Sequence, residues 1–544
     1  ISGPPVLAGL FQTCEAVFSV GARRGRAAMS GMRGLPMALP LLLLRLEAAV
    51  PALALEGPPG TEGYYWFKRA GTYVGNGAVP FEFPTDLSRP PAWTWDNPDD
   101  ELFRHGPVID DKKNIYAATT FGWIRKFSPD GQVLWSLRMS MAEGNVITSP
   151  FLYKGRLYIT SMGWPRGHAH VVHCIDMETG ERVWSKLGPS GFVNMDSATV
   201  HAAEGVLLGA TMSHPSAGGN NKIWAVNTTD GNHLWDFVIE PSRVWNFMPS
   251  TPGDGTFLFA SPCVTAARHR LSDGSRIWKS TFGDIGFCGT GGGTLGPDGV
   301  FYAVGNHFGP EPSPGVPMCV QGYCPEGCGI LVAYDMEDGK VRWVRRLQLG
   351  FGGWQYPTVG KIDGVMRIVA GIGHNPSIPE WTMGPKFLPE FVRFQIARLQ
   401  VRFAWLRRLL EVPAKRNAVA VHNAEKGDLV WLWEEEPWSY FGAAGDEMTL
   451  IERALKTFTD PRAECICGPD NWGIPVIAAD GTVIMGSGSS GNLYAIRDKN
   501  GDKVIDPSEV STFKTGNAFL NGPAVAPGMM VGAPCWGKMY VFKD

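Results

Sequence analysis

The chain has 544 residues, of which 44% are hydrophobic and 19% are charged, and it contains 68 glycines and 20 tryptophans. This composition is sufficient for a large buried core, and low charge with abundant glycine is typical of an all-β protein with many turns. The formal net charge is −3. A chain without an excess of positive charge has no general attraction for nucleic acid, so a nucleic-acid partner is not expected.

Residues 1–54 are predicted to be a leader with a signal peptide. Met29 or Met32 fits a start, Leu35–Leu44 is an apolar run, and Ala52–Ala54 offers a cleavage site with small residues. We therefore expect a secreted protein or one in the lumen of the secretory pathway. An uncleaved membrane anchor is the alternative.

One phrase recurs six times after this leader: an apolar strand, a tight polar turn ending in Gly, and a strand ending in Trp. Self-similarity of this kind indicates a repeat architecture. The closing residues of the six copies are Trp135, Trp184, Trp235, Trp278, Trp343 and Trp431.

Each unit is expected to form four antiparallel strands. Residues 149–186 show the pattern, because four runs rich in Val, Ile, Tyr and Trp are separated by Gly, Asp and Pro. Four-stranded units repeated around an axis make a β-propeller. Two altered units, Ile474–Gly501 and Gly522–Asp544, bring the count to eight blades over residues 108–544, with seven as the runner-up. In the N-terminal segment, residues 55–107, a strand such as Tyr64–Lys68 is expected to close the ring.

The repeated phrase resembles that of the PQQ-type (quinoprotein alcohol dehydrogenase-like) propeller family, from roughly Val108 to Asp544. The resemblance implies that the closing Trp residues pack between neighbouring blades. Enzymes of the family hold PQQ and Ca²⁺ on the propeller axis with a catalytic Asp, and many have a disulfide between adjacent cysteines. This chain has no adjacent Cys pair, and neither catalytic nor PQQ-binding residues can be placed by motif. Candidates for an axial pocket are His105, Trp354, His374, Asn375, Asn471 and Trp472.

Residues 498–509 resemble an EF-hand calcium loop. Ca²⁺ takes six to eight oxygen ligands, and this loop supplies oxygens at the expected positions. The predicted ligands are the side chains of Asp498, Asn500, Asp502, Asp506 and Glu509 and the carbonyl of Val504. The family has Gly where this chain has Lys503, and the flanking segments read as strands. We therefore expect a structural calcium site that stabilises a propeller hairpin (a calcium staple). The alternative is an acidic turn that is solvated and binds no calcium.

Residues 386–412 are predicted to form a helix inserted between blade strands. Pro389 suits the first turn and Pro413 the stop, and six Lys or Arg residues share the segment with aromatic residues. A basic amphipathic helix can lie on an anionic membrane as a peripheral contact. It can equally cover the propeller with its arginines reaching water.

Ten cysteines are present, and a secreted location makes disulfides the expected state. Nine remain if Cys14 is removed with the leader, so at least one thiol is expected to be free or intermolecular. The pairing cannot be deduced from spacing.

Two classes of function follow. The first is a monomeric scaffold that binds calcium and a protein or glycan partner, as non-catalytic members of the resembling family do with proteins. The alternative is a PQQ-dependent quinoprotein oxidoreductase acting on alcohols or sugars.

Overall fold

The computed structural model describes residues 60–68, 77–98 and most of residues 101–544. The longer stretches outside this description are 189–198, 282–290, 307–328, 377–388 with most of 390–413, and 447–466. Residues 1–59, and with them the predicted leader, are also outside it. Within the described part of the chain, no helix has the length and apolar character needed to cross a membrane.

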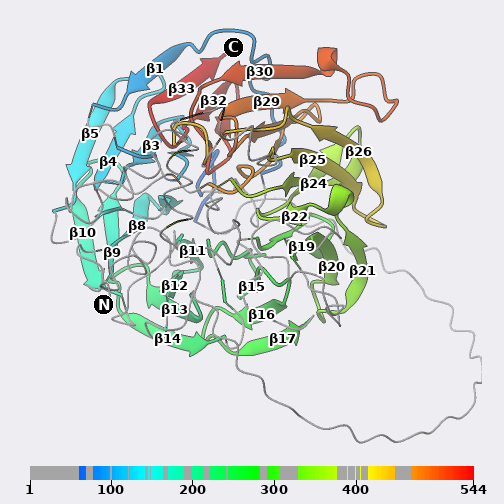
Figure 1. Cartoon of the computed structure of the whole chain (residues 1–544). Coiled ribbons are helices and arrows are strands. Elements are labelled where there is room, and N and C mark those ends of the chain that lie inside the picture. Colours follow the sequence, from blue (N-terminus) through cyan, green and yellow to red (C-terminus); the bar gives the residue numbers. More distant parts are fainter. Residues whose placement is uncertain are drawn as a thin grey trace, which may run out of the picture.

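Eight separate antiparallel sheets follow one another around a ring (Figure 1). Five of them have four strands, the fourth has three, and the second and sixth have five. The predicted all-β, eight-bladed propeller is therefore confirmed, and the seven-bladed alternative is wrong.

The first four blades occupy the chain from Val108 to Ser280. Blade 1 contains β2 (Val108–Ile109), β3 (Ile115–Ala118), β4 (Trp123–Phe127) and β5 (Val133–Arg138). Blade 2 contains β6 (Asn145–Val146), β7 (Phe151–Tyr153), β8 (Arg156–Met162), β9 (His170–Asp176) and β10 (Arg182–Leu187). Blade 3 contains β11 (His201–Ala203), β12 (Val206–Thr211), β13 (Lys222–Asn227) and β14 (His233–Val238). Blade 4 contains β15 (Thr256–Ala260), β16 (Ala266–Arg270) and β17 (Arg276–Ser280).

The second half of the ring contains the insertions. Blade 5 contains β18 (Gly293–Leu295), β19 (Val300–Asn306), β20 (Gly329–Asp335) and β21 (Val341–Arg346). The 3₁₀ turn η2 (Gln348–Gly350) leads to blade 6, which contains β22 (Gly352–Gly353), β23 (Thr358–Ile362), β24 (Val365–Gly373), β25 (Asn417–Asn423) and β26 (Leu429–Glu434). Blade 7 contains β27 (Val476–Ile477), β28 (Val483–Gly486), β29 (Asn492–Ile496) and β30 (Val510–Lys514), with η4 (Pro507–Glu509) before β30. Blade 8 contains β31 (Ala524–Ala526), β32 (Met529–Gly532), β33 (Lys538–Lys543) and β1 (Trp93–Asp96).

The position of a strand in its blade determines its burial. Middle strands such as β19 and β12 are buried along their whole length, because neighbouring blades cover both of their faces. The closing strands β5, β10, β14, β17 and β21 lie on the rim, and their residues are mostly exposed or half-buried. The core therefore lies between blades and toward the axis.

Blade 8 closes the ring by joining the two ends of the propeller. Strand β1 pairs antiparallel with β33, with Trp93 opposite Val541 and Asp96 opposite Lys538. A closing strand from the N-terminal segment was correctly predicted, but its position at Tyr64–Lys68 was wrong. The apolar side chains of that stretch are buried against inner strands instead: Trp66 exchanges backbone hydrogen bonds with Ile109 of β2.

The N-terminal segment then runs along the inner strands of several blades before it reaches blade 8. The carbonyl of Phe67 accepts a hydrogen bond from the backbone N–H of Leu152 in β7. Farther along, the N–H of Val79 donates to the carbonyl of Ile477 in β27. The segment therefore contacts blades 1, 2 and 7.

The helix predicted within residues 386–412 lies almost entirely outside the described residues. Of the residues described there, Val392, Leu399 and Trp405 have helical geometry, and the N–H of Phe403 donates to the carbonyl of Leu399. The described part of the chain contains no α-helix among its elements, so the structure does not support the helical insertion.

A repeated latch joins blades 1 to 6 in succession. The indole N–H of a closing Trp donates to a carbonyl in the following blade's outer turn, and the Gly of that turn lies against the Trp ring. The same bond joins Trp135 to Met177, Trp184 to Thr228, Trp235 to Leu271, Trp278 to Met336 and Trp343 to Ala424. The predicted packing of these five tryptophans between blades is confirmed.

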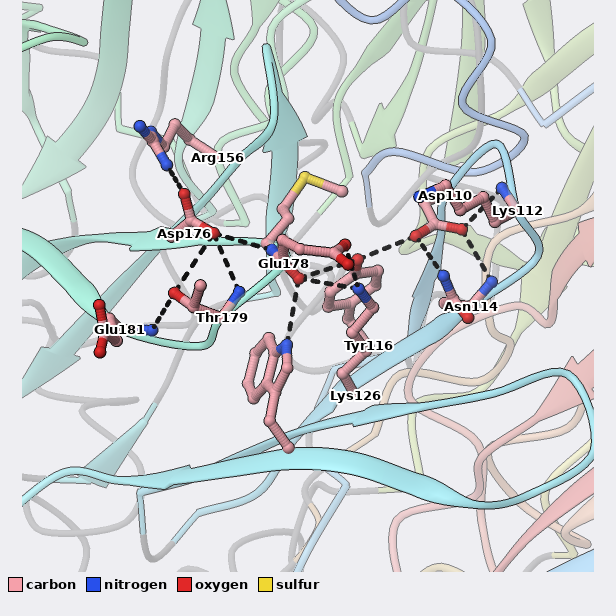
Figure 2. A network of polar contacts seen from close by, with 12 residues as sticks. Asp110, Lys112, Asn114, Tyr116, Lys126, Arg156, Asp176, Glu178, Thr179 and Glu181 are labelled. Carbon is pink, nitrogen blue, oxygen red and sulfur yellow. Dashed lines mark hydrogen bonds and ion pairs between the residues drawn. The ribbon is translucent and has the colours of Figure 1, made fainter.

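Figure 2 shows this latch between blades 1 and 2 in its polar surroundings. The Met177 carbonyl also accepts hydrogen bonds from Lys126 Nζ at 2.9 Å and from the Tyr116 hydroxyl at 3.5 Å. The Asp176 carboxylate accepts the N–H groups of Glu178 and Thr179 and so fixes the turn that presents this carbonyl. The Met177 carbonyl thus accepts hydrogen bonds from side chains on three strands of blade 1.

Candidate functional site

The predicted calcium loop connects β29 to β30 and forms the outer turn of blade 7. In blades 1 to 6 this place is taken by the short turn that receives the closing Trp of the preceding blade. Blade 7 has the longer loop 498–509 there, and Ile505 of this loop packs against a buried cluster that includes Trp431 of blade 6. The loop therefore lies at the junction of blades 6 and 7.

Side-chain oxygens of the loop point toward its own backbone. Asp498 accepts hydrogen bonds from the N–H groups of Gly501 at 2.8 Å and Lys503 at 3.0 Å. Asn500 Oδ1 accepts the N–H of Asp502 at 2.9 Å, and Asp502 Oδ1 accepts the N–H of Val504 at 2.8 Å. Each carboxylate or amide oxygen has a second lone pair, so these bonds orient the oxygens without consuming their capacity for a cation.

Glu509 closes the loop. Its carboxylate accepts the N–H groups of Asp506 at 3.0 Å, Lys499 at 2.6 Å and Asn500 at 3.2 Å. These backbone donors, with that of Asp506 largest, lower the pKa of Glu509 from its usual value. Glu509 is only 6% exposed, and it belongs to a capping box with Asp506 at the 3₁₀ turn η4. The last predicted ligand is therefore ionised and held in place.

Lys503 stands at the position where the family has Gly, and its backbone takes the conformation that favours Gly, with φ of 69°. A side chain in this left-handed region costs about 1–2 kcal/mol. The backbone at Lys503 thus takes a conformation that Gly adopts without this cost.

The structure does not bring the predicted ligands into a metal-binding cluster. Among the residues that it describes, no three His, Cys, Asp or Glu side chains are placed so that they could hold a metal ion. The calcium ligands therefore stay a prediction.

Several of the axial candidates meet between blades 6 and 7. Asp470, which sequence reasoning did not single out, accepts hydrogen bonds from Gln355 Nε2 at 2.7 Å and from Asn375 Nδ2 at 3.1 Å. Asn471 is fully buried, and neither polar atom of its side chain has a hydrogen-bond partner in the described part of the chain. The result is a largely buried cluster in which one carboxylate accepts hydrogen bonds from two amides.

The remaining axial candidates have structural contacts. Trp354 and Trp472 donate their indole N–H groups to the carbonyls of Gly373 and Ile372 in β24. His374 Nδ1 accepts the backbone N–H of Arg416 at 3.1 Å, and burial together with the nearby Arg416 lowers the pKa of His374. His105 is buried ahead of β2, on a different blade.

A second buried carboxylate lies close to this junction. Glu435, which is 4% exposed, accepts hydrogen bonds from Asn417 Nδ2, Ser487 Oγ and Ser490 Oγ at 2.8–3.0 Å. Burial raises the pKa of Glu435 to about 7, against the opposing effect of these donors. The group joins blade 6 to blade 7, and the sequence offered no motif for it.

One disulfide supports the cysteine prediction. Cys467 and Cys535 are bonded with a Cα–Cα distance of 5.7 Å, which is within the usual range. Cys174 is a buried free thiol, as the odd count predicted, and burial raises its pKa to about 11. The cysteine-rich loop with Cys319, Cys324 and Cys328 lies outside the described residues.

Comparison with known proteins agrees with this architecture. Residues 86–247 match the family PQQ_2, described as outer membrane protein assembly factor BamB. None of the curated protein sequences matches the chain.

Two solved dehydrogenase structures share the fold at low sequence identity. Quinohemoprotein alcohol dehydrogenase ADHIIG from Pseudomonas putida HK5 is 11% identical, with a TM-score of 0.55 over 89% of this chain and 80% of that chain. The quinohemoprotein alcohol dehydrogenase from Comamonas testosteroni is 11% identical, with a TM-score of 0.53 over 88% and 80%. BamB from Moraxella catarrhalis is 13% identical, with a TM-score of 0.49 over 84% and 99%.

The Trp-closed repeat, the eight blades and the family match point to one conclusion. The chain is an eight-bladed β-propeller, and its residues 86–247 are similar to a PQQ-type repeat family.

Proposed function

We propose that this protein is a calcium-stapled propeller that acts by binding a partner in an oxidising compartment of the secretory pathway or outside the cell. The observation that carries the proposal is the position of the loop 498–509. It replaces the latch turn of blade 7, and Ile505 of this loop packs against the inter-blade cluster of Trp431. A cation held there would fasten the junction of blades 6 and 7.

The residues of the loop fit a hard cation in their chemistry. Asp498, Asn500, Asp502, Asp506 and Glu509 would supply side-chain oxygens, and Val504 its carbonyl. The N–H bonds to Asp498 and Glu509 already orient these carboxylates within the loop. Bound calcium would neutralise the acidic loop, and its role would be structural.

A binding role is favoured because the N-terminal segment lies against inner strands of the ring. The N-terminal segment contacts β2, β7 and β27. A cavity lined by Lys68, Ser149 and His201 has room for about one water molecule. The family match to an assembly factor favours a protein partner, with a glycan as the other candidate.

The oxidising compartment is supported by the Cys467–Cys535 disulfide, since such bonds persist mainly in secreted and lumenal proteins. The signal peptide, the monomeric state and membrane contact through residues 386–412 remain predictions.

A PQQ-dependent oxidoreductase is the second candidate. It is favoured by the buried patch of Asp470, Gln355 and Asn375, because a carboxylate among amides suits cofactor orientation. The two dehydrogenases of similar fold belong to this class by name.

Calorimetric titration separates the two candidates. The protein, stripped of metal, is titrated with Ca²⁺ and then with PQQ, alongside Glu509→Gln and the control Glu425→Gln in the exposed turn of blade 6. We expect calcium heat in the wild type and the control, a loss of at least tenfold in affinity in Glu509→Gln, and no PQQ heat. Equal calcium affinity in all three proteins would contradict calcium binding by the loop 498–509. PQQ binding followed by dye-linked alcohol oxidation would establish the oxidoreductase.

A further inference from the structure

Lys68 is a buried lysine whose ammonium group meets no hydrogen-bond acceptor among the described residues. Its side chain is 3% exposed, and its Nζ has no hydrogen-bond acceptor in the part of the chain that the structure describes. Burying an ammonium group without a counter-charge is costly. Burial alone lowers the pKa of Lys68 to about 7.

The Lys68 side chain lines a small cavity on the inner side of the ring. Lys68 directly follows Phe67, whose carbonyl is bonded to β7 of blade 2. The cavity has about 10 Å³ of space for the centre of a water-sized sphere, and its lining residues are Lys68, Ser149, Pro150, Thr199, Val200, His201 and Met248. They come from the N-terminal segment, from the entries to blades 2 and 3, and from the segment ahead of blade 4.

The polar groups of this lining carry no negative charge. Ser149 Oγ donates to the Gly106 carbonyl at 3.2 Å, and Thr199 Oγ1 donates to the Phe247 carbonyl. His201 Nε2 lies 3.0 Å from Thr251 Oγ1. Burial, and then the neighbouring Lys68, lower the pKa of His201 well below its usual value, so the imidazole is neutral. The described lining leaves the charge of Lys68 unbalanced.

We propose that this cavity binds one small monovalent anion of halide size, held by the ammonium group of Lys68. A halide ion is close to a water molecule in size, and the cavity has room for about one such particle. Three of the walls, Pro150, Val200 and Met248, are apolar, which suits a weakly hydrated ion. The anion balances the buried charge and gives Nζ the acceptor that the described protein atoms do not supply.

The site would fasten the N-terminal segment to the ring. Lys68 belongs to that segment, whereas Ser149 and His201 belong to blades 2 and 3. An ion that binds only the folded arrangement stabilises it in proportion to the logarithm of its concentration above the dissociation constant. The stability of the protein should therefore depend on the kind of anion present.

Crystals of the whole chain soaked in sodium bromide test the site directly, because bromide scatters anomalously. The expected result is an anomalous peak within hydrogen-bond reach of Lys68 Nζ. A water molecule in the cavity without an anomalous signal, next to a neutral lysine, would overturn the proposal.

Thermal unfolding tests the same site in solution. Wild type, Lys68→Met and the control Lys112→Met, an exposed lysine of blade 1, are compared in bromide, chloride and gluconate at equal ionic strength. We expect halides to raise the Tm of the wild type and the control by a few degrees over gluconate and to leave Lys68→Met unchanged. An equal rise in all three proteins would refute a site at Lys68. Should Lys68→Met fail to fold, the bromide result on the wild type decides.

Discussion

At the scale of single residues, the closing tryptophans do most to hold the ring together, since each contributes an apolar ring and one directed N–H. Trp93 fulfils the same role for blade 8, because its indole donates to the Pro129 carbonyl at 2.8 Å and covers Gly131. The sequence analysis missed this residue, since WTWD lacks the turn and the Gly that precede Trp in the other copies. Trp135 and its counterparts were predictable because the whole phrase recurs.

Trp235 offers a direct test of the latch. It is 9% exposed, donates to the Leu271 carbonyl at 2.9 Å and lies against Gly274. We expect Trp235→Ala to lower the free energy of unfolding by about 3–5 kcal/mol. Trp235→Phe keeps a ring but leaves the carbonyl unpaired, which costs about 1–3 kcal/mol. Urea denaturation followed by circular dichroism measures both, and an equal loss in the two variants would show that the N–H dominates.

The buried Glu435 should make stability depend on pH. Its pKa is raised to about 7 in the folded protein from an ordinary value of 4.5, so the folded state binds the proton more tightly than the unfolded chain. This contribution to stability is complete below pH 4.5 and is lost as the pH rises through about 7. Glu435→Gln cannot titrate. We expect the Tm of this variant, relative to wild type, to rise between pH 4.5 and pH 8, and a constant difference would contradict the assignment.

At the scale of elements, the loop 498–509 shows how much local sequence determines. The pattern of acidic residues predicted the turn, and Lys503 indeed adopts the positive φ of 69° that the family reserves for Gly. What the pattern did not predict is that the side-chain oxygens of Asp498, Asn500 and Glu509 accept hydrogen bonds from the backbone of the loop itself. The metal ligands therefore remain a prediction.

Lys503→Gly should relieve strain in this loop. A residue with a side chain loses about 1–2 kcal/mol of stability in the left-handed backbone conformation. Gly avoids this strain, but the greater freedom of its unfolded chain lowers stability by up to about 1 kcal/mol. We expect a gain in stability of less than about 1 kcal/mol without calcium. Calcium affinity should rise as well, since one positive charge is removed. Calorimetry and thermal unfolding measure the two effects. A weaker calcium affinity in the variant would indicate that the backbone turn does not limit binding.

At the scale of the whole molecule, the sequence repeat was sufficient to predict the architecture. It was not sufficient to predict the contacts between segments that are distant in the sequence. Eight blades follow from six clear copies and two altered ones. Tyr64–Lys68 was predicted to close the ring because it reads as an apolar strand, but it pairs with β2, an inner strand far away in the sequence. Asp470 and Lys68 were missed for the same reason: only the closed ring brings them into a buried setting.

The disulfide links two segments of the closing part of the ring. Cys467 precedes blade 7, Cys535 lies between β32 and β33 of blade 8, and the sequence separation is 68 residues. A closed loop of that length restricts the unfolded chain by roughly 4 kcal/mol in the entropic account. We expect the double variant Cys467→Ser, Cys535→Ser to lose up to about that amount. Thermal unfolding of the variant and of the reduced wild type measures it, and an unchanged Tm in both would show that the bond adds nothing.

The pairing of β1 with β33 also sets the order in which the protein can be completed. Strand β1 is made early, and its edge remains open until residues Lys538–Lys543 are made. During synthesis, an exposed strand edge with two tryptophans is available to chaperones, and also to the wrong strand of another copy. The edge of β1 is therefore covered only when synthesis has reached β33, because β33 is the strand that pairs with it.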